Sequence, residues 1–170
     1  MHSVLKGCPC GYLTDPSRRC RCPSTKVHSY LAKISGPLLD RIDLHIEVPA
    51  VPWQAIAHAG TGEPSAQIQA RILRAQRRQR QRLKTLRLSC NAALRHRDLR
   101  AACPMTEAAA ALLRSAMQEL HLSARSFDKV LKIARTIVDL AGADEILPEH
   151  IAEAIQYRSL DRQVWVQSAA

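Results

Sequence analysis

The sequence predicts a mainly helical protein whose leading part ends in a single strand. Alanine and leucine are frequent among its 170 residues, whereas only one Phe, two Trp and three Tyr occur, which favours packed helices over a β-sandwich. After residue 65, apolar residues recur at three and four residue steps, as on one face of a helix. Only residues 42–48 alternate apolar and polar side chains with the period of a strand. The expected class is therefore mainly α with one or two strands.

The leading part, residues 1–50, is expected to hold a cysteine-rich loop, a helix and the strand. Ser24 can cap a helix that runs to about Ile34, and the string PLLDR predicts a helical turn after it. The strand IDLHIEV needs partner strands, because a single strand cannot form a sheet. Residues 51–66 include the string HAGTGEPS, whose Gly, Pro and small polar residues predict a linker.

The trailing part, residues 67–160, is expected to be a helical bundle followed by a tail over residues 161–170. Gly142 is a natural C-terminal stop, and Pro148 suits a first helical turn. Ile68, Ile72 and Ala75 are expected to lie on one side of the first helix, opposite its arginines. The predicted helices cover Ser65 to Leu86, Arg97 to Ala102, Thr106 to Leu120, Ser123 to Gly142, and a segment from Pro148 onward.

Positive charge is concentrated in one part of this basic chain. The formal net charge is +10, and the stretch from Arg71 to Arg100 holds eleven Arg or Lys residues against one acid, Asp98. Such a stripe is typical of a surface that binds a polyanion, most often nucleic acid. The alternative is a solvated helix whose arginines meet acidic groups of a neighbouring subunit. The candidate DNA-binding residues are Arg71, Arg74, Arg77, Arg78, Arg80, Arg82 and Lys84.

Four of the six cysteines form two Cys-x-Cys pairs in CPCGYLTDPSRRCRC, residues 8–22. Cys8, Cys10, Cys20 and Cys22 offer four thiolates to one structural Zn²⁺, at a spacing tighter than usual. A metal-free insertion loop and redox chemistry are the alternatives, and a disulfide is disfavoured in a reducing compartment. Cys90 and Cys103 are interpreted as ordinary buried thiols.

Other classes of protein are disfavoured by the sequence. No run of about 18 or more apolar residues occurs, and MHSVLKG lacks the apolar core of a signal peptide, so we expect a cytoplasmic protein with no membrane partner. The seven histidines show no metal-ligand or catalytic spacing and are expected to be satisfied surface side chains, with His45 on the polar face of the strand.

Two long strings carry a resemblance to a known family. CPCGYLTDPSRRCRCPSTKVHSYLAKISGPLLDRIDLHIEVP and SARSFDKVLKIARTIVDLAGADEILPEHIAEAIQYRSLDR resemble the C-terminal half of the YifB/ComM-like proteins, AAA+ ATPases related to magnesium chelatase. The resemblance extends from about Gly7 to Arg162. It implies the rear of an AAA+ α/β core and the helical lid of a hexameric ring of like subunits that binds ATP with Mg²⁺. In ComM members it also implies DNA branch migration.

The resemblance assigns roles to two arginines. Arg41 of LLDR would be the arginine finger, which stabilises charge on a phosphoryl group bound in the neighbouring subunit. Arg125 of SAR would be the sensor 2 arginine, which contacts ATP in its own subunit. The alternatives are a surface ion pair for Arg41 and a solvated first-turn arginine for Arg125.

Two departures from the family pattern predict that the chain alone is inactive as an ATPase. No Gly-x-x-x-x-Gly-Lys-Ser/Thr loop and no acidic pair for Mg²⁺ occur, and Lys6-Gly7 replaces the Asn-Pro of sensor 1, as expected of a truncated member. The alternative to a ring component is a stand-alone zinc-stabilised module that binds nucleic acid or protein without nucleotide.

Overall fold

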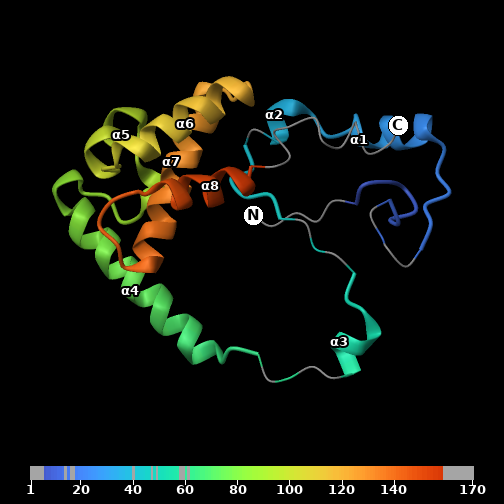
Figure 1. Ribbon diagram of the computed structural model, residues 1–170, viewed down its shortest axis with the longest axis horizontal. Coiled ribbons are helices and arrows are strands. Elements are labelled where there is room, and N and C mark those ends of the chain that lie inside the picture. Colours follow the sequence, from blue (N-terminus) through green and yellow to red (C-terminus); the bar gives the residue numbers. More distant parts are fainter. Residues whose placement is uncertain are drawn as a thin grey trace. The chain divides into compact units, whose positions relative to one another are not determined.

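The structure, a computed structural model, describes residues 6–13, 15, 18–39, 41–46, 48, 50–57, 60 and 62–158. The chain divides into two compact units, Thr61–Arg158 and Met1–Gly60 with Ser159–Ala170. The residues described are mainly helical, which confirms the predicted class (Figure 1). The predicted tail, residues 161–170, lies outside the described residues.

Helices make up the regular structure described in both units. The first unit contains α1 (Ser24–Leu31), α2 (Gly36–Leu39) and α3 (Trp53–Ala57). The second unit contains α4 (Ser65–Leu83), η1 (Lys84–Leu86), η2 (Asn91–Ala93), α5 (His96–Ala102), α6 (Glu107–Glu119), α7 (Ala124–Ala141) and α8 (Pro148–Gln156). Helix α3 was not predicted and lies in the stretch expected to be a linker.

The second unit is built around α7. This helix packs against both α4 and α8, and α6 packs against α8 (Figure 1). Val130, Leu131, Ala134 and Val138 recur at three and four residue steps along α7 and are all buried. They form the centre of one apolar core to which every helix of the unit except η2 contributes or packs. The unit therefore has the continuous core that a stable domain requires.

Local signals in the sequence fix both ends of α7. The Ser123 hydroxyl accepts a hydrogen bond from the Ser126 amide at 3.1 Å, which satisfies one of the unpaired N–H groups at the helix start. At the other end Gly142 has φ 76°, a left-handed conformation that glycine adopts without strain, and the Ala143 amide donates to the Val138 carbonyl at 3.1 Å. The prediction that this helix lies between Ser123 and Gly142 is confirmed.

A backbone connection joins the segments that precede α6 and α8. The Thr106 amide donates to the Ile146 carbonyl at 3.1 Å, and the Ile146 amide donates to the Pro104 carbonyl at 2.9 Å, which forms an isolated parallel bridge between Met105 and Ile146. The side chain of Ile146 is fully buried. The two helix starts are thus held side by side where Thr106 caps α6 and Pro148 opens α8.

The first unit differs from two of the predictions made for it. Ser24 is the first residue of α1 rather than its cap, because the preceding position is Pro23, and no side-chain cap bond forms. The predicted strand over residues 42–48 is also wrong for Ile42–Ile46 and Val48, none of which is in a strand. The physical reason is that a strand exists only where a second strand pairs with it, and none of the described residues forms a strand.

The side chains of that segment are arranged opposite to the expectation. Leu44, Ile46 and Val48 are 49%, 67% and 83% exposed, whereas His45 is only 5% exposed. His45 was predicted to lie on the polar surface, and this prediction is wrong. His150 is buried as well, and its Nδ1 accepts a hydrogen bond from the Leu147 amide at the start of α8.

The apolar side predicted for α4 is only partly covered. Ala75 is buried, but Ile68 and Ile72 are 37% and 43% exposed. The helix packs against α7 near its C-terminal half, where Ala75, Gln79 and Leu83 are the buried residues. The first turns of α4 extend past this contact, which explains why Ile68 remains accessible (Figure 1).

Candidate functional site

The four cysteines of the leading loop come together, as their pattern predicts. One sulfur from each of Cys8, Cys10, Cys20 and Cys22 lies within 4.8 Å of every other. The Cys8 sulfur is 3.3 Å from that of Cys10 and 3.6 Å from that of Cys20, and the Cys10 and Cys20 sulfurs are 3.5 Å apart. All four are free thiols, and Cys8 is fully buried. We call these four residues the cysteine cluster.

Backbone geometry explains how such a short spacing brings the sulfurs together. The Gly11 amide donates to the Cys8 carbonyl at 3.0 Å and closes a turn around Cys10. Gly11 has φ 82°, a left-handed conformation that glycine adopts without strain, so this turn favours glycine. The opposite arm approaches through Arg18, which donates to the Tyr12 hydroxyl at 2.8 Å and lies over its ring.

The thiols of the cluster influence one another's ionisation. The backbone amide of Tyr12 and then the Cys8 thiol favour the Cys10 thiolate and lower the pKa of Cys10 to about 6. The Cys22 amide favours the Cys20 thiolate, but burial and the neighbouring thiols outweigh it and raise the pKa of Cys20 to about 12. One thiolate is therefore favoured near neutral pH, and its presence opposes ionisation of the next.

The two arginines assigned by resemblance lie in different units. Arg41 follows α2 in the first unit and is exposed, and its amide donates to the Leu38 carbonyl at 3.0 Å. Arg125 lies in the first turn of α7 in the second unit and is also exposed. The end of a helix at which Arg125 lies carries partial positive charge and unpaired N–H groups, which favours an anion nearby.

The basic stretch of α4 and the start of η1 divides into two groups of side chains. Arg71 pairs with Glu63 at 2.8 Å, Arg78 pairs with Asp144 at 2.7 Å, and Arg82 pairs with Asp139. The second group, Arg74, Arg77, Arg80 and Lys84, is exposed and makes no ion pair with any acid that the structure describes. We call these four residues the exposed basic group.

A buried polar network, absent from the predictions, surrounds Asp139. Its carboxylate accepts hydrogen bonds from Arg82 at 2.8 Å, Asn91 at 2.9 Å and Arg135 at 3.0 Å. Arg135 also donates to the Asp144 carbonyl at 2.6 Å. The sequence signal was an Arg and an Asp four residues apart within the apolar stripe of α7. The network connects α4, η2 and α7 and accounts for Arg82 as a structural residue.

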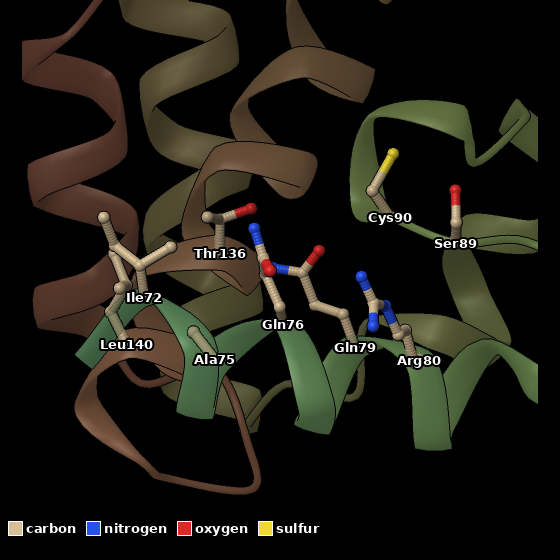
Figure 2. Close-up of a pocket in the computed structure, with 9 residues that line it drawn as sticks. All are labelled: Ile72, Ala75, Gln76, Gln79, Arg80, Ser89, Cys90, Thr136 and Leu140. Carbon is tan, nitrogen blue, oxygen red and sulfur yellow. The ribbon is translucent and has the colours of Figure 1, made fainter. Parts of the chain in front are cut away.

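A small cavity lies beside this network, between α4 and α7 (Figure 2). Its volume is about 440 Å³, and Gln76 and Gln79 of α4 lie beside Thr136 of α7, with Cys90 across the cavity. None of the nine residues that line it is an acid or a histidine. Cys90 is half-buried there, whereas Cys103 is buried in the core as predicted.

The helices of the second unit coincide with a known domain. Residues 62–158 match the family described as magnesium chelatase, subunit ChlI C-terminal, and residues 3–56 match magnesium chelatase, subunit ChlI. The chain belongs to the magnesium chelatase ChlI family. The C-terminal match spans α4 to α8, and the other match includes the cysteine cluster and Arg41.

Relatives in this family share sequence over most of the chain. Protein YifB of Salmonella typhimurium is 39% identical over 143 residues, covering 84% of this chain and 28% of the relative. Competence protein ComM of Haemophilus influenzae is 36% identical over 161 residues, covering 94% and 30%. Rv2897c of Mycobacterium tuberculosis is 33% identical over 155 residues, covering 91% and 31%. The chain thus spans somewhat under a third of the length of these magnesium chelatase-related proteins.

None of the helices in the described part of the chain is both long enough and apolar enough to cross a bilayer.

Proposed function

We propose that this chain is the part of a magnesium chelatase-type AAA+ ATPase that contributes two nucleotide-contacting arginines and a DNA-binding lid. The observation that carries the proposal is that Arg41 and Arg125 are exposed in a chain of this family. Some other arginines of the chain are buried. Arg135 and Arg158 are 1% exposed each, so they are unavailable to a nucleotide. Arg41 and Arg125 remain accessible to a ligand.

Arg41 is proposed as the arginine finger, acting on ATP bound by a neighbouring subunit of a hexameric ring. A guanidinium suits this role because it is always charged and its planar fork engages two phosphate oxygens. Arg41 lies two residues beyond the end of the short helix α2 (Gly36–Leu39), and its amide donates to the Leu38 carbonyl, so its backbone is anchored while its side chain reaches solvent. This combination is what a residue that crosses an interface requires.

Arg125 is proposed as the sensor 2 residue, acting on ATP in its own subunit. Its place on the first turn of α7 combines a cation with the anion-favouring end of a helix. Helix α7 is the central helix of the second unit, so a pull on Arg125 would move the whole lid. The chain has no phosphate loop, and these two residues therefore act on a nucleotide and Mg²⁺ held by other residues.

The first unit supports a place in a larger α/β core. Residues 42–48 keep the alternation of a strand, yet Leu44, Ile46 and Val48 expose their apolar side chains. An alternating apolar segment becomes a strand when a neighbouring strand satisfies its backbone and a second layer covers its face.

DNA is the proposed partner of the lid, and remodelling of DNA such as branch migration is the proposed outcome of ATP hydrolysis. The exposed basic group supplies three cations along α4 and a fourth, Lys84, at the start of η1, which suits the regularly spaced phosphates of a duplex. One relative, ComM, is described as a competence protein.

The DNA proposal is tested with the chain alone by fluorescence anisotropy on a labelled duplex. If the four cations each neutralise one phosphate, log affinity should fall with log salt at a slope of about −3.6, since each contact contributes about −0.9. Replacing Arg74, Arg77 and Arg80 by Ala should reduce the slope to about −0.9. Arg114→Ala, an exposed arginine on α6, is the matched control and should leave the slope unchanged. Binding that does not respond to salt would exclude this surface.

The nucleotide proposal needs a complete ATPase, obtained by replacing the matching segment of the Haemophilus influenzae ComM relative with this chain. Arg41→Ala should lower kcat by about 10³-fold or more, the scale of a lost arginine finger, with little change in DNA affinity. Arg41→Lys should fail to restore turnover, because an ammonium lacks the planar fork. Arg114→Ala again serves as control. An unchanged kcat in Arg41→Ala would contradict the finger assignment.

A second candidate is a nucleic-acid-binding module that uses no nucleotide. The self-contained core of the second unit favours it, because Thr61–Arg158 has its own apolar interior. The two candidates are distinguished by the chimera: the module predicts DNA binding that depends on the exposed basic group and ATPase activity that is indifferent to both Arg41 and Arg125.

A further inference from the structure

We propose that the cysteine cluster binds one zinc ion as a structural tetrathiolate site, and that this ion holds the first unit in its folded form. The inference is independent of the ATP and DNA roles proposed above. It rests on the positions of the four sulfurs, on the backbone around them and on the composition of the core of the first unit.

The sulfur positions fit a single tetrahedral ion. Zinc–sulfur bonds of about 2.3 Å place the corners of a tetrahedron about 3.8 Å apart. The measured separations of 3.3, 3.5 and 3.6 Å among Cys8, Cys10 and Cys20 lie close to this value, and all four sulfurs are within 4.8 Å of one another. An iron–sulfur cluster puts several metal atoms between its thiolates and needs wider separations. The geometry therefore favours one zinc ion.

Backbone groups support the sulfurs as they do in metal sites. The Cys22 amide points to the Cys20 sulfur at 3.5 Å, and the turn closed by Gly11 directs Cys8 and Cys10 to the same side. Hydrogen bonds of this kind orient the ligands and stabilise thiolate charge. The contact between Arg18 and Tyr12 joins the arm that carries Cys10 to the arm that carries Cys20. Both arms are thus held before an ion binds.

The positive charge of the loop is suited to a negatively charged zinc site. Binding releases to solvent the protons that the four cysteines still carry and leaves a zinc tetrathiolate of charge −2, with no electron transferred and no open ligand position. Arg18, Arg19 and Arg21 lie within the same loop, and Arg19 and Arg21 are exposed. Their positive charge offsets the charge of the site.

The first unit also lacks another source of stability among its described residues. Its buried apolar side chains are Cys8 and Val27, whereas fourteen buried residues make up the core of the second unit. A segment with so small an apolar core needs a metal, a disulfide or a partner to stay folded. Because the thiols are free and close together, the binding energy of zinc becomes folding energy for this unit.

The first test measures metal content of the full chain expressed with added zinc and purified with a reductant. Elemental analysis should find about one zinc per chain, the stoichiometry of a tetrathiolate site. Cys10→Ser and Cys20→Ser should each lower zinc affinity by at least about tenfold in competition with a chromogenic chelator. Cys90→Ser replaces a free cysteine outside the cluster and should retain the zinc of the parent chain. Equal zinc affinity in Cys20→Ser and Cys90→Ser would overturn the site, as would iron with sulfide in place of zinc.

The second test uses the unsubstituted chain, so it does not depend on whether a variant folds. Titration of the metal-free chain with Co²⁺ should give the visible bands of tetrahedral thiolate coordination at one equivalent, and added Zn²⁺ should bleach them. Hydrogen exchange should then show that a chelator removes protection from residues 8–34 while α7 keeps its protection. Absence of the cobalt bands would overturn zinc binding. Unchanged protection of residues 8–34 after zinc removal would overturn its structural role.

Discussion

Replacement of Asp139 tests how the second unit is stabilised. Its side chain is fully buried, and its carboxylate receives hydrogen bonds from Arg82, Asn91 and Arg135. Arg135 is only 2% exposed at its side chain, so Asp139→Ala would leave a buried guanidinium without its counter-charge. Removing one partner of a buried ion pair is much more costly than the pair itself is stabilising, because the remaining charge stays desolvated.

The size of the expected loss of stability in Asp139→Ala follows from that burial. Breaking a buried pair costs about 3–5 kcal/mol, and domains have total stabilities of about 5–15 kcal/mol. For a domain under 100 residues each kcal/mol shifts Tm by about 4–8 °C, so Asp139→Ala should lower the Tm of the second unit by at least about 12 °C. Asp139→Asn should cost nearly as much, because it keeps the shape but removes the negative charge.

The measurements are thermal and urea unfolding followed by far-UV circular dichroism, with Asp144→Ala as the matched control. Asp144 also pairs with an arginine of α4, at 2.7 Å, but its side chain is 96% exposed, so its replacement should cost less than about 1 kcal/mol. If Asp139→Asn and Asp144→Ala shift the midpoint equally, the network is not the stabilising feature described above.

Two further predictions concern the same unit. Burial disfavours the Asp139 carboxylate, but hydrogen bonds from Arg82, Asn91 and Arg135 outweigh it and hold the pKa of Asp139 below its ordinary value. An unfolded Asp has a pKa of about 3.9, so the stabilisation that the Asp139 carboxylate provides is present above about pH 4 and is lost as the pH falls through the lower folded pKa. The urea midpoint should therefore decline less between about pH 6 and pH 3 in Asp139→Asn than in the parent chain. Gly142→Ala should lower the free energy of unfolding by about 1 kcal/mol in the same assay. The cost comes from the positive φ alone, because an added Cβ meets nothing within 4 Å. An unchanged free energy of unfolding would show that the C-terminal end of α7 relaxes.

The helices of the second unit could be predicted from sequence because their signals are local. Caps at Thr106 and Ser123, the stop at Gly142 and the start at Pro148 each depend on a few neighbouring residues. The cysteine cluster was likewise predictable, since two Cys-x-Cys pairs on one short loop have few ways to lie far apart. Neither prediction required knowledge of contacts distant in the chain.

The strand and the basic surface could not be predicted in the same way. The alternation of apolar and polar residues in 42–48 indicates which side chains would share a face, but a strand exists only where another strand pairs with it. The sequence also presents all the cations of α4 as one stripe. Arg78 and Arg82 instead meet Asp144 and Asp139, acids 66 and 57 residues away, and such long-range pairs depend on how α4 packs against α7.

The pairing of these arginines bears directly on the DNA proposal. Arg82 alternates along the chain with Arg80 and Lys84, yet it is drawn inward by a buried carboxylate while its neighbours remain exposed. A helix turns by about 100° per residue, so one basic run necessarily presents cations to both the protein and the solvent. The same packing contact with α7 that partly buries Arg82 also fixes the orientation of α4. The structural arginines thereby determine where Arg74, Arg77 and Arg80 are displayed, and loss of Asp139 should disturb DNA binding only as far as it unfolds the second unit.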